Sequence, residues 1–99
     1  MKKGDLVRVT KDFGGLTPIT PRGLERWQEI YKGNMIDDAG EPRLSPRHEW
    51  VEFRTGKVLI VSRARVNPKR AEFLDAETGM HVTVDNREWQ TRIEVLGKQ

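Results

Sequence analysis

The chain has 99 residues, a formal net charge of +3 and no cysteine, with 35% hydrophobic and 33% charged residues. This length supports one compact domain, and the lack of cysteine excludes disulfides, thiol chemistry and thiolate zinc sites. No apolar run approaches the length of a membrane span and no signal-peptide pattern follows the N-terminal lysines, so we expect a cytoplasmic protein.

The first predicted element is a strand over residues 3–10. Val7 and Val9 alternate with residues that point the other way, which is the pattern of a strand with one buried face. We predict that the pair Gly14-Gly15 ends this strand in a turn, because paired glycines favour turns and interrupt strand pairing.

One helix is predicted, over residues 21–32. Thr20 is a suitable N-cap, Pro21 occupies the tolerated first helical position, and Gly33 follows the helix end. Apolar side chains recur at three- to four-residue steps on one face: Leu24, Trp27, Ile30 and Tyr31. Three turns are not stable alone, so we expect this face to cap one end of a sheet or barrel, with Trp27 in the core.

Residues 34–48 are predicted to be an irregular loop, since they contain several turn-forming residues and two prolines. A loop of this length in a small domain is often functional. Its acidic and imidazole side chains suggest a metal site, but their spacing matches no calcium loop and the chain offers no histidine pair for zinc. We therefore expect an exposed turn and no metal. The residues concerned are Asp37, Asp38, Glu41, His48 and His81.

The rest of the chain reads as short strands separated by polar turns. Strands are predicted over residues 50–54, 57–66, 71–75, 80–85 and 89–96. Gly79 supplies the positive φ that the turn of the 71–85 hairpin needs, and residues 85–88 form another polar turn. About six antiparallel strands with one early helix favour a small bent sheet or a barrel, which leaves no long exposed edge.

The opening Lys3-Gly-Asp-Leu-Val-Arg-Val-Thr, followed by Gly14-Gly15, resembles the start of KOW-type SH3-like barrels. These modules occur in ribosomal proteins and transcription elongation factors. The segment Gly56-Lys57-Val58-Leu59-Ile60-Val61 resembles their second strand. The hairpin 73–84 and the segment Ile93-Glu94-Val95-Leu96 would complete five strands.

The C-terminal segment also resembles small SH3-like proteins of phages and cyanobacteria, in which a Trp shortly precedes a closing Leu/Ile-Glu-Val segment. Together the resemblances cover residues 1–15 and 56–96. They imply a mainly β, SH3-like barrel of about five to six antiparallel strands with one inserted α-helix at about residues 21–32. We expect a single domain over residues 1–99, with a helix-plus-loop insertion at about residues 16–55, a departure from the KOW pattern.

A run of basic residues without any acid is the strongest functional candidate. It lies between Gly56 and Ala71 and contains Lys57, Arg63, Arg65, Lys69 and Arg70. Lys57, Arg63 and Arg65 differ by even steps, so on one extended strand they share a face. Such a stripe could neutralise nucleic-acid phosphates. The alternative is a solvated basic edge that keeps this strand from pairing with another chain.

Two tryptophans are candidates for base stacking beside these basic residues. Trp50 and Trp89 each begin a predicted strand next to a polar turn, where an indole is often half exposed. Single-strand binding proteins use such rings as stacking platforms. The alternative is that both rings close the ends of the barrel.

Catalysis is not expected. No serine, threonine or lysine lies in a recognisable nucleophile motif, and the chain has neither a phosphate-binding loop nor a dinucleotide fingerprint. We expect no enzyme activity and no cofactor. The leading hypothesis is a small non-catalytic binding module that contacts RNA or single-stranded DNA through the basic strand face. The alternative is a protein-interaction or assembly module, such as a phage accessory protein or an oligomeric subunit, that docks through the helix and loop.

Overall fold

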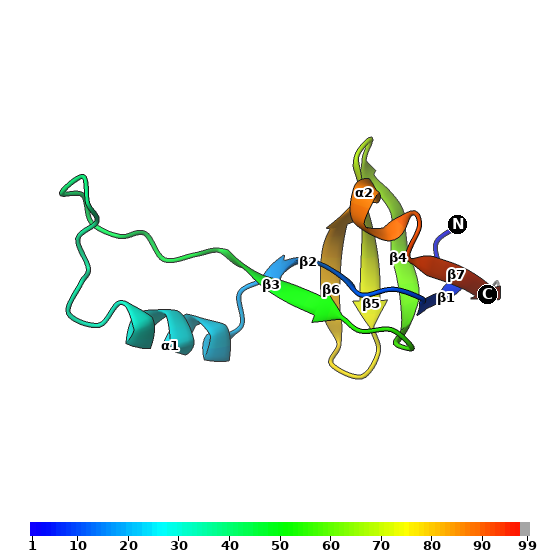
Figure 1. The fold of residues 1–99 in the computed structure, drawn as a ribbon, viewed down its shortest axis with the longest axis horizontal. Coiled ribbons are helices and arrows are strands. Elements are labelled where there is room, and N and C mark those ends of the chain that lie inside the picture. The colour runs from blue at the N-terminus through cyan, green and yellow to red at the C-terminus, as the bar shows by residue number, and fades with distance from the viewer. Residues whose placement is uncertain (98–99) are drawn as a thin grey trace. The chain divides into compact units, whose positions relative to one another are not determined.

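The computed structural model describes residues 1–97, which form one seven-stranded, unclosed sheet and two helices (Figure 1). The strands are β1 (Leu6–Val9), β2 (Phe13–Pro18), β3 (His48–Phe53), β4 (Val58–Asn67), β5 (Arg70–Asp75), β6 (Met80–Asp85) and β7 (Ile93–Gly97). The helices are α1 (Pro21–Ile30) and α2 (Asn86–Trp89). The strand order is β3-β2-β6-β5-β4-β1-β7, and the paired strands are antiparallel. The mainly β prediction is confirmed, with one more strand and one more helix than expected in this part of the chain.

The chain divides into two compact units. Among the described residues, the sheet unit comprises residues 1–17 and 50–97, and the inserted unit comprises residues 18–49. The sequence placed the insertion at about residues 16–55. Neither helix within residues 1–97 has the length and apolar character needed to cross a lipid bilayer.

The hydrophobic core lies in the sheet unit and follows the period-two pattern of its strands. Val7 and Val9 are fully buried, as the alternation in β1 predicts. Phe73 lies centrally, with its ring edge-on to Phe13 at a centroid distance of 6.1 Å. The buried hydrophobic residues are Val7, Val9, Phe13, Phe53, Leu59, Val61, Ala71, Phe73, Val82 and Val84.

The prediction that Gly14-Gly15 forms a turn is wrong, because both residues are buried inside β2. A Cβ on Gly14 would lie 2.5 Å from the Trp50 ring and 2.6 Å from the Val51 carbonyl oxygen. A Cβ on Gly15 would meet the Thr83 carbonyl oxygen. The glycines are therefore needed where neighbouring groups approach the β2 backbone closely, not for a change of chain direction.

Helix α1 begins as predicted and ends two residues earlier than expected. The Thr20 hydroxyl accepts a 3.0 Å hydrogen bond from the Gly23 backbone N–H, and Pro21 is the first helical residue. No residue of α1 is buried. Trp27 is half-buried against Tyr31, at a ring distance of 5.5 Å, and does not belong to the core. The expectation of a core tryptophan is wrong because the helix belongs to the inserted unit.

The loop after α1 is more regular than expected. Ile36 and Pro42 form an isolated β-bridge, and Arg43 N–H donates to the Met35 carbonyl. The Asp37 carboxylate accepts the backbone N–H groups of Ala39 and Glu41 at 3.0 and 2.9 Å. This Asp-centred turn closes a small hairpin without the help of a hydrophobic core.

Two predictions near the C-terminus need correction. Residues 86–89 are the short helix α2 rather than a turn, because the Asp85 carboxylate accepts the Arg87 N–H and caps it. Trp89 ends α2 and does not begin the last strand, which starts at Ile93. The hairpin before α2 is confirmed, with Gly79 at φ 72°.

Candidate functional site

A β-bulge in β4 decides which way the basic side chains of this strand point. Val61 pairs with Phe73, but two residues later Arg63 pairs with Glu72, so β4 holds one extra residue there. Without the bulge, Arg63 would share the inner face with Leu59 and Val61. With it, Arg63 lies on the outer face and is exposed.

Three more cations of the predicted set lie close to Arg63 in the fold. Arg65 follows on β4 and is exposed, while Ala64 between them packs against the core. Arg70 begins β5 on the face opposite buried Ala71, and Lys69 lies in the β4–β5 turn. The β4–β5 hairpin therefore brings together four of the five predicted basic residues.

A fifth cation comes from α2, for which the sequence pattern predicts a polar turn. The Asn86 backbone N–H donates to the Lys69 carbonyl at 2.8 Å, and the Asn86 side chain donates to the Pro68 carbonyl at 3.2 Å. These bonds hold the start of α2 beside the β4–β5 turn, as Figure 1 shows, and they bring exposed Arg87 to this end of the sheet. A capping Asp85 followed by Arg87 was the signal available in the sequence. We call these five residues the basic tip: Arg63, Arg65, Lys69, Arg70 and Arg87.

Three carboxylates neighbour the residues of the basic tip, and each already has a hydrogen-bond donor: Glu72, Asp85 and Glu88, the last bonded to Arg92 at 3.0 Å. Glu72 accepts from the Ser62 hydroxyl at 2.8 Å and lies 3.1 Å from His81 Nδ1. Asp85 caps α2 and lines an open hollow of about 360 Å³ together with the β4–β5 turn. Within residues 1–97, no residue of the basic tip takes part in an ion pair. The strand ladders place Glu72 opposite Arg63 and Asp85 opposite Arg70, so this surface keeps an excess of positive over negative charge rather than a purely basic character.

Lys57 does not belong to this surface, contrary to the even-step argument. Its ammonium group lies 3.0 Å from the Asp75 carboxylate and 2.7 Å from that of Glu77, and its side chain is 22% exposed. The hydrogen bond to Glu77, followed by that to Asp75, raises the pKa of Lys57 above its usual value. The bulge separates Lys57 from the face of Arg63 and Arg65, and its charge is balanced by the two carboxylates.

The two candidate tryptophans are also not assembled with the basic tip. The Trp89 ring meets Phe73 edge-on at 6.0 Å, and its N–H donates to the Asn86 side chain at 3.0 Å. Trp50 is 60% exposed, but it lies on β3, and three strands stand between β3 and β4 in the sheet order. Trp89 thus anchors α2 to the core, and Trp50 marks a separate part of the sheet.

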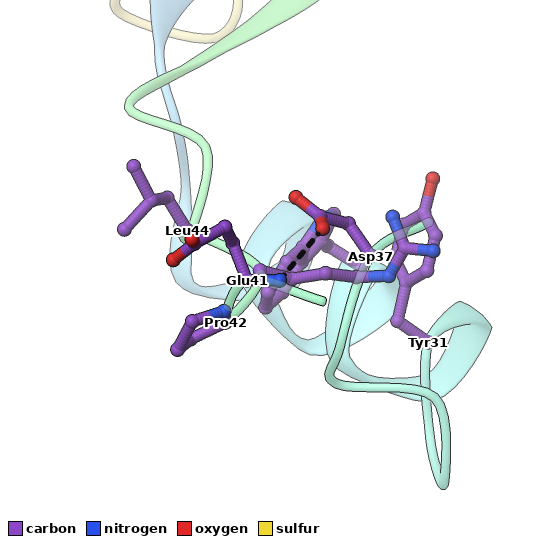
Figure 2. Close-up of a pocket in the computed structure, with 7 residues that line it drawn as sticks. Tyr31, Asp37, Glu41, Pro42 and Leu44 are labelled. Atoms are coloured by element: carbon purple, nitrogen blue, oxygen red, sulfur yellow. Dashed lines mark hydrogen bonds between the residues drawn. The ribbon is translucent and has the colours of Figure 1, made fainter. Parts of the chain in front are cut away.

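The inserted unit contains a pocket of its own, of about 530 Å³ (Figure 2). The Arg43 guanidinium lies 4.5 Å from the centre of the Tyr31 ring, and its Nε donates to the Asn34 carbonyl at 2.8 Å. The lining residues are Trp27, Tyr31, Asp37, Glu41, Pro42, Arg43 and Leu44. The lining of the pocket therefore combines two aromatic rings and a leucine with two carboxylates.

The acidic residues of the loop do not form a metal-binding cluster in the part of the chain that the structure describes. Among the residues that the structure describes, no three His, Asp or Glu side chains are grouped so that they could hold a metal ion. Asp37 is engaged by its own hairpin, as described above.

Comparison with known proteins adds no further constraint on the site. No protein-family model, no curated protein and no solved structure matches the chain.

Proposed function

We propose that the chain is a small non-catalytic binding module that contacts the phosphates of RNA or DNA through the basic tip. The proposal is carried by one observation: five exposed cations from β4, β5, α2 and the β4–β5 turn lie at one end of the sheet without ion-pair partners in residues 1–97. Cations of this kind bind phosphates and release condensed counterions, which provides affinity without sequence readout.

The related fold proposal is an SH3-like barrel. It is supported by the direct pairing of β1 with β4, because these strands contain the two segments that resemble KOW modules. Val7 pairs with Leu59 in this ladder, and both side chains are in the core. The insertion between β2 and β3 would then be an addition to the module.

The test is the salt dependence of binding, measured by fluorescence anisotropy with a labelled oligonucleotide. Contact with four to five phosphates of a duplex predicts that the logarithm of the association constant falls against the logarithm of salt concentration with a slope of about −3.6 to −4.5. The double variant Arg63→Gln/Arg65→Gln should bind more weakly and reduce the magnitude of this slope by about 1.8.

The matched control is Arg22→Gln/Arg26→Gln in α1, which makes the same change in net charge outside the sheet unit. Its affinity should stay close to that of the wild type. Equal weakening in both double variants would mean that net charge, not the basic tip, determines binding, and would reject the assignment of this surface.

A second candidate function, protein interaction or assembly, is favoured by a specific feature of the inserted unit. Large apolar side chains are exposed there, with Leu44 at 87%, Ile30 at 68% and Ile36 at 60% exposure. Exposed apolar surface of this kind often marks a protein contact. Light scattering across a concentration series tests this function, and a monomer at every concentration with no binding partner would count against it.

A further inference from the structure

The basic tip differs from a typical single-strand binding surface in one respect, its lack of an accessible Phe, Tyr or Trp ring. In the sheet unit, Phe13, Phe53 and Phe73 are buried. Trp89 comes closest in the chain to the basic tip, but its ring packs on Phe73 and its N–H is bonded to Asn86. Stacking a base on Trp89 would require this contact with the core to break.

The remaining Phe, Tyr or Trp side chain of the sheet unit is Trp50, which is far from the basic tip along the sheet. The strands β2, β6 and β5 lie between β3 and β4. Neighbouring strands are about 4.8 Å apart, so the path along the sheet from β3 to β4 is about 19 Å. One face of the Trp50 ring lies against β2, because a Cβ on Gly14 would clash with it. The nucleotides whose phosphates contact Arg63 and Arg65 therefore cannot stack their own bases on Trp50.

The two forms of nucleic acid make different demands on such a surface. Single-stranded nucleic acid is typically held by a basic groove together with aromatic rings that stack on its bases. A duplex keeps its bases stacked inside and presents one negative charge per roughly 1.7 Å of its axis. A compact group of cations without aromatic rings therefore gains more from a duplex than from a flexible single strand.

We infer that the basic tip binds duplex nucleic acid through its phosphates, without sequence preference, and prefers it to single strands. This inference rests on the proposed function and specifies its ligand class. Arg63 and Arg65, about 6.6 Å apart along β4 at the usual strand rise, contact one backbone. Lys69, Arg70 and Arg87 contact phosphates further along or across the groove.

The experiment compares three probes by anisotropy at about 50 and about 200 mM salt. The probes are a mixed-sequence duplex, a duplex of scrambled sequence and oligo(dT) of the same length. The two duplexes should bind equally, and about tenfold or more tightly than oligo(dT) at the lower salt. The Trp50→Ala variant should bind the duplexes as the wild type does.

The outcomes separate the inference from the proposal on which it rests. Failure of all three probes to bind at the lower salt would reject nucleic-acid binding altogether. Oligo(dT) binding as tight as duplex binding, and weakened by Trp50→Ala, would overturn the duplex inference while leaving nucleic-acid binding in place. Tight binding of one duplex but not of its scrambled form would show that the protein reads base sequence, and would overturn the inference of phosphate contact without sequence preference.

Discussion

In the sheet unit, ten hydrophobic side chains are buried, whereas no residue of the inserted unit reaches the same degree of burial in the structure. The sheet is held by pairings between residues far apart in the chain, such as Val7 with Leu59 and Val9 with Ile93. The inserted unit is held by a helix cap, an Asp-centred turn and a cation–π contact between Arg43 and Tyr31. The comparison shows that local hydrogen bonds can shape a segment without supplying the burial that stabilises a domain.

The largest expected effect is in the core of the sheet. Phe73→Ala should destabilise the protein by about 3–5 kcal/mol, because it removes a fully buried ring and leaves a cavity. Urea unfolding followed by tryptophan fluorescence measures this. Trp27→Ala in the inserted unit is the comparison, with an expected cost below about 1 kcal/mol. A similar cost for both variants would show that the inserted unit has a core that matters.

A smaller effect is expected where β2 meets β3. Gly14→Ala should cost about 1–3 kcal/mol, because its Cβ would clash with the Trp50 ring and the Val51 carbonyl. Thermal unfolding measures the loss. In a Trp50→Ala background only part of the loss should be recovered, since the backbone oxygen remains. A fully neutral Gly14→Ala would contradict the close approach at this strand.

A local effect is expected in the inserted unit. Thr20→Ala removes the N-cap of α1 and should cost that helix about 1 kcal/mol. Because α1 contributes no residue to the core, NMR signals of α1 should shift toward coil values while the sheet signals stay unchanged. Thr20→Ser keeps a hydroxyl and should restore the helical shifts. Loss of the sheet signals in Thr20→Ala would mean that the two units unfold together.

The smallest expected effect is a pH dependence of stability that arises from the contact between Asp12 and Thr55. The Thr55 backbone N–H, and then its hydroxyl, donate to Asp12 and hold the pKa of this carboxyl below its usual value of 3.8. The charged form is therefore favoured in the folded state, and its contribution is present above pH 3.8 and is lost as the pH falls through the lower, folded pKa. Asp12→Asn should lower the melting temperature at neutral pH, and the difference from the wild type should shrink in acid.

Thr55→Ala serves as the control for this pH dependence. It keeps the backbone donor and removes only the hydroxyl, so it should reproduce part of the effect. A difference between the wild type and Asp12→Asn that stays constant down to acid pH would contradict the lowered pKa.

The sequence predicted those parts of the fold that depend on neighbouring residues. The alternation of Val7 and Val9, the Thr20 cap and the Gly79 turn are each set by local rules, and each is confirmed. The roles of Gly14 and Gly15 could not be predicted, because the groups that approach them come from β3 and β6. The amphipathic pattern of α1 likewise does not determine whether another element covers its apolar face.

The candidate site shows the same limit. Steps of two along the predicted strand 57–66 placed Lys57 with Arg63 and Arg65, but the extra residue at the bulge puts Arg63 on the opposite face. No local signal in β4 marks that residue. Arg87 joins the basic tip through Asn86, which contacts a turn that lies 18 positions away in the chain. Both facts depend on strand register, which one sequence does not specify.

The hydrogen bond from the Ile19 N–H to the Arg47 carbonyl, 3.0 Å long, closes the base of the insertion next to the paired strands β2 and β3. The two ends of the segment 20–46 thus lie next to each other, so the segment forms a closed loop that begins and ends at one place in the fold. The entropy of closing such a loop grows only logarithmically with its length, by about 0.6 kcal/mol for each doubling. The sheet should therefore accept a shorter turn, or a larger graft, at this position with little change in its own stability.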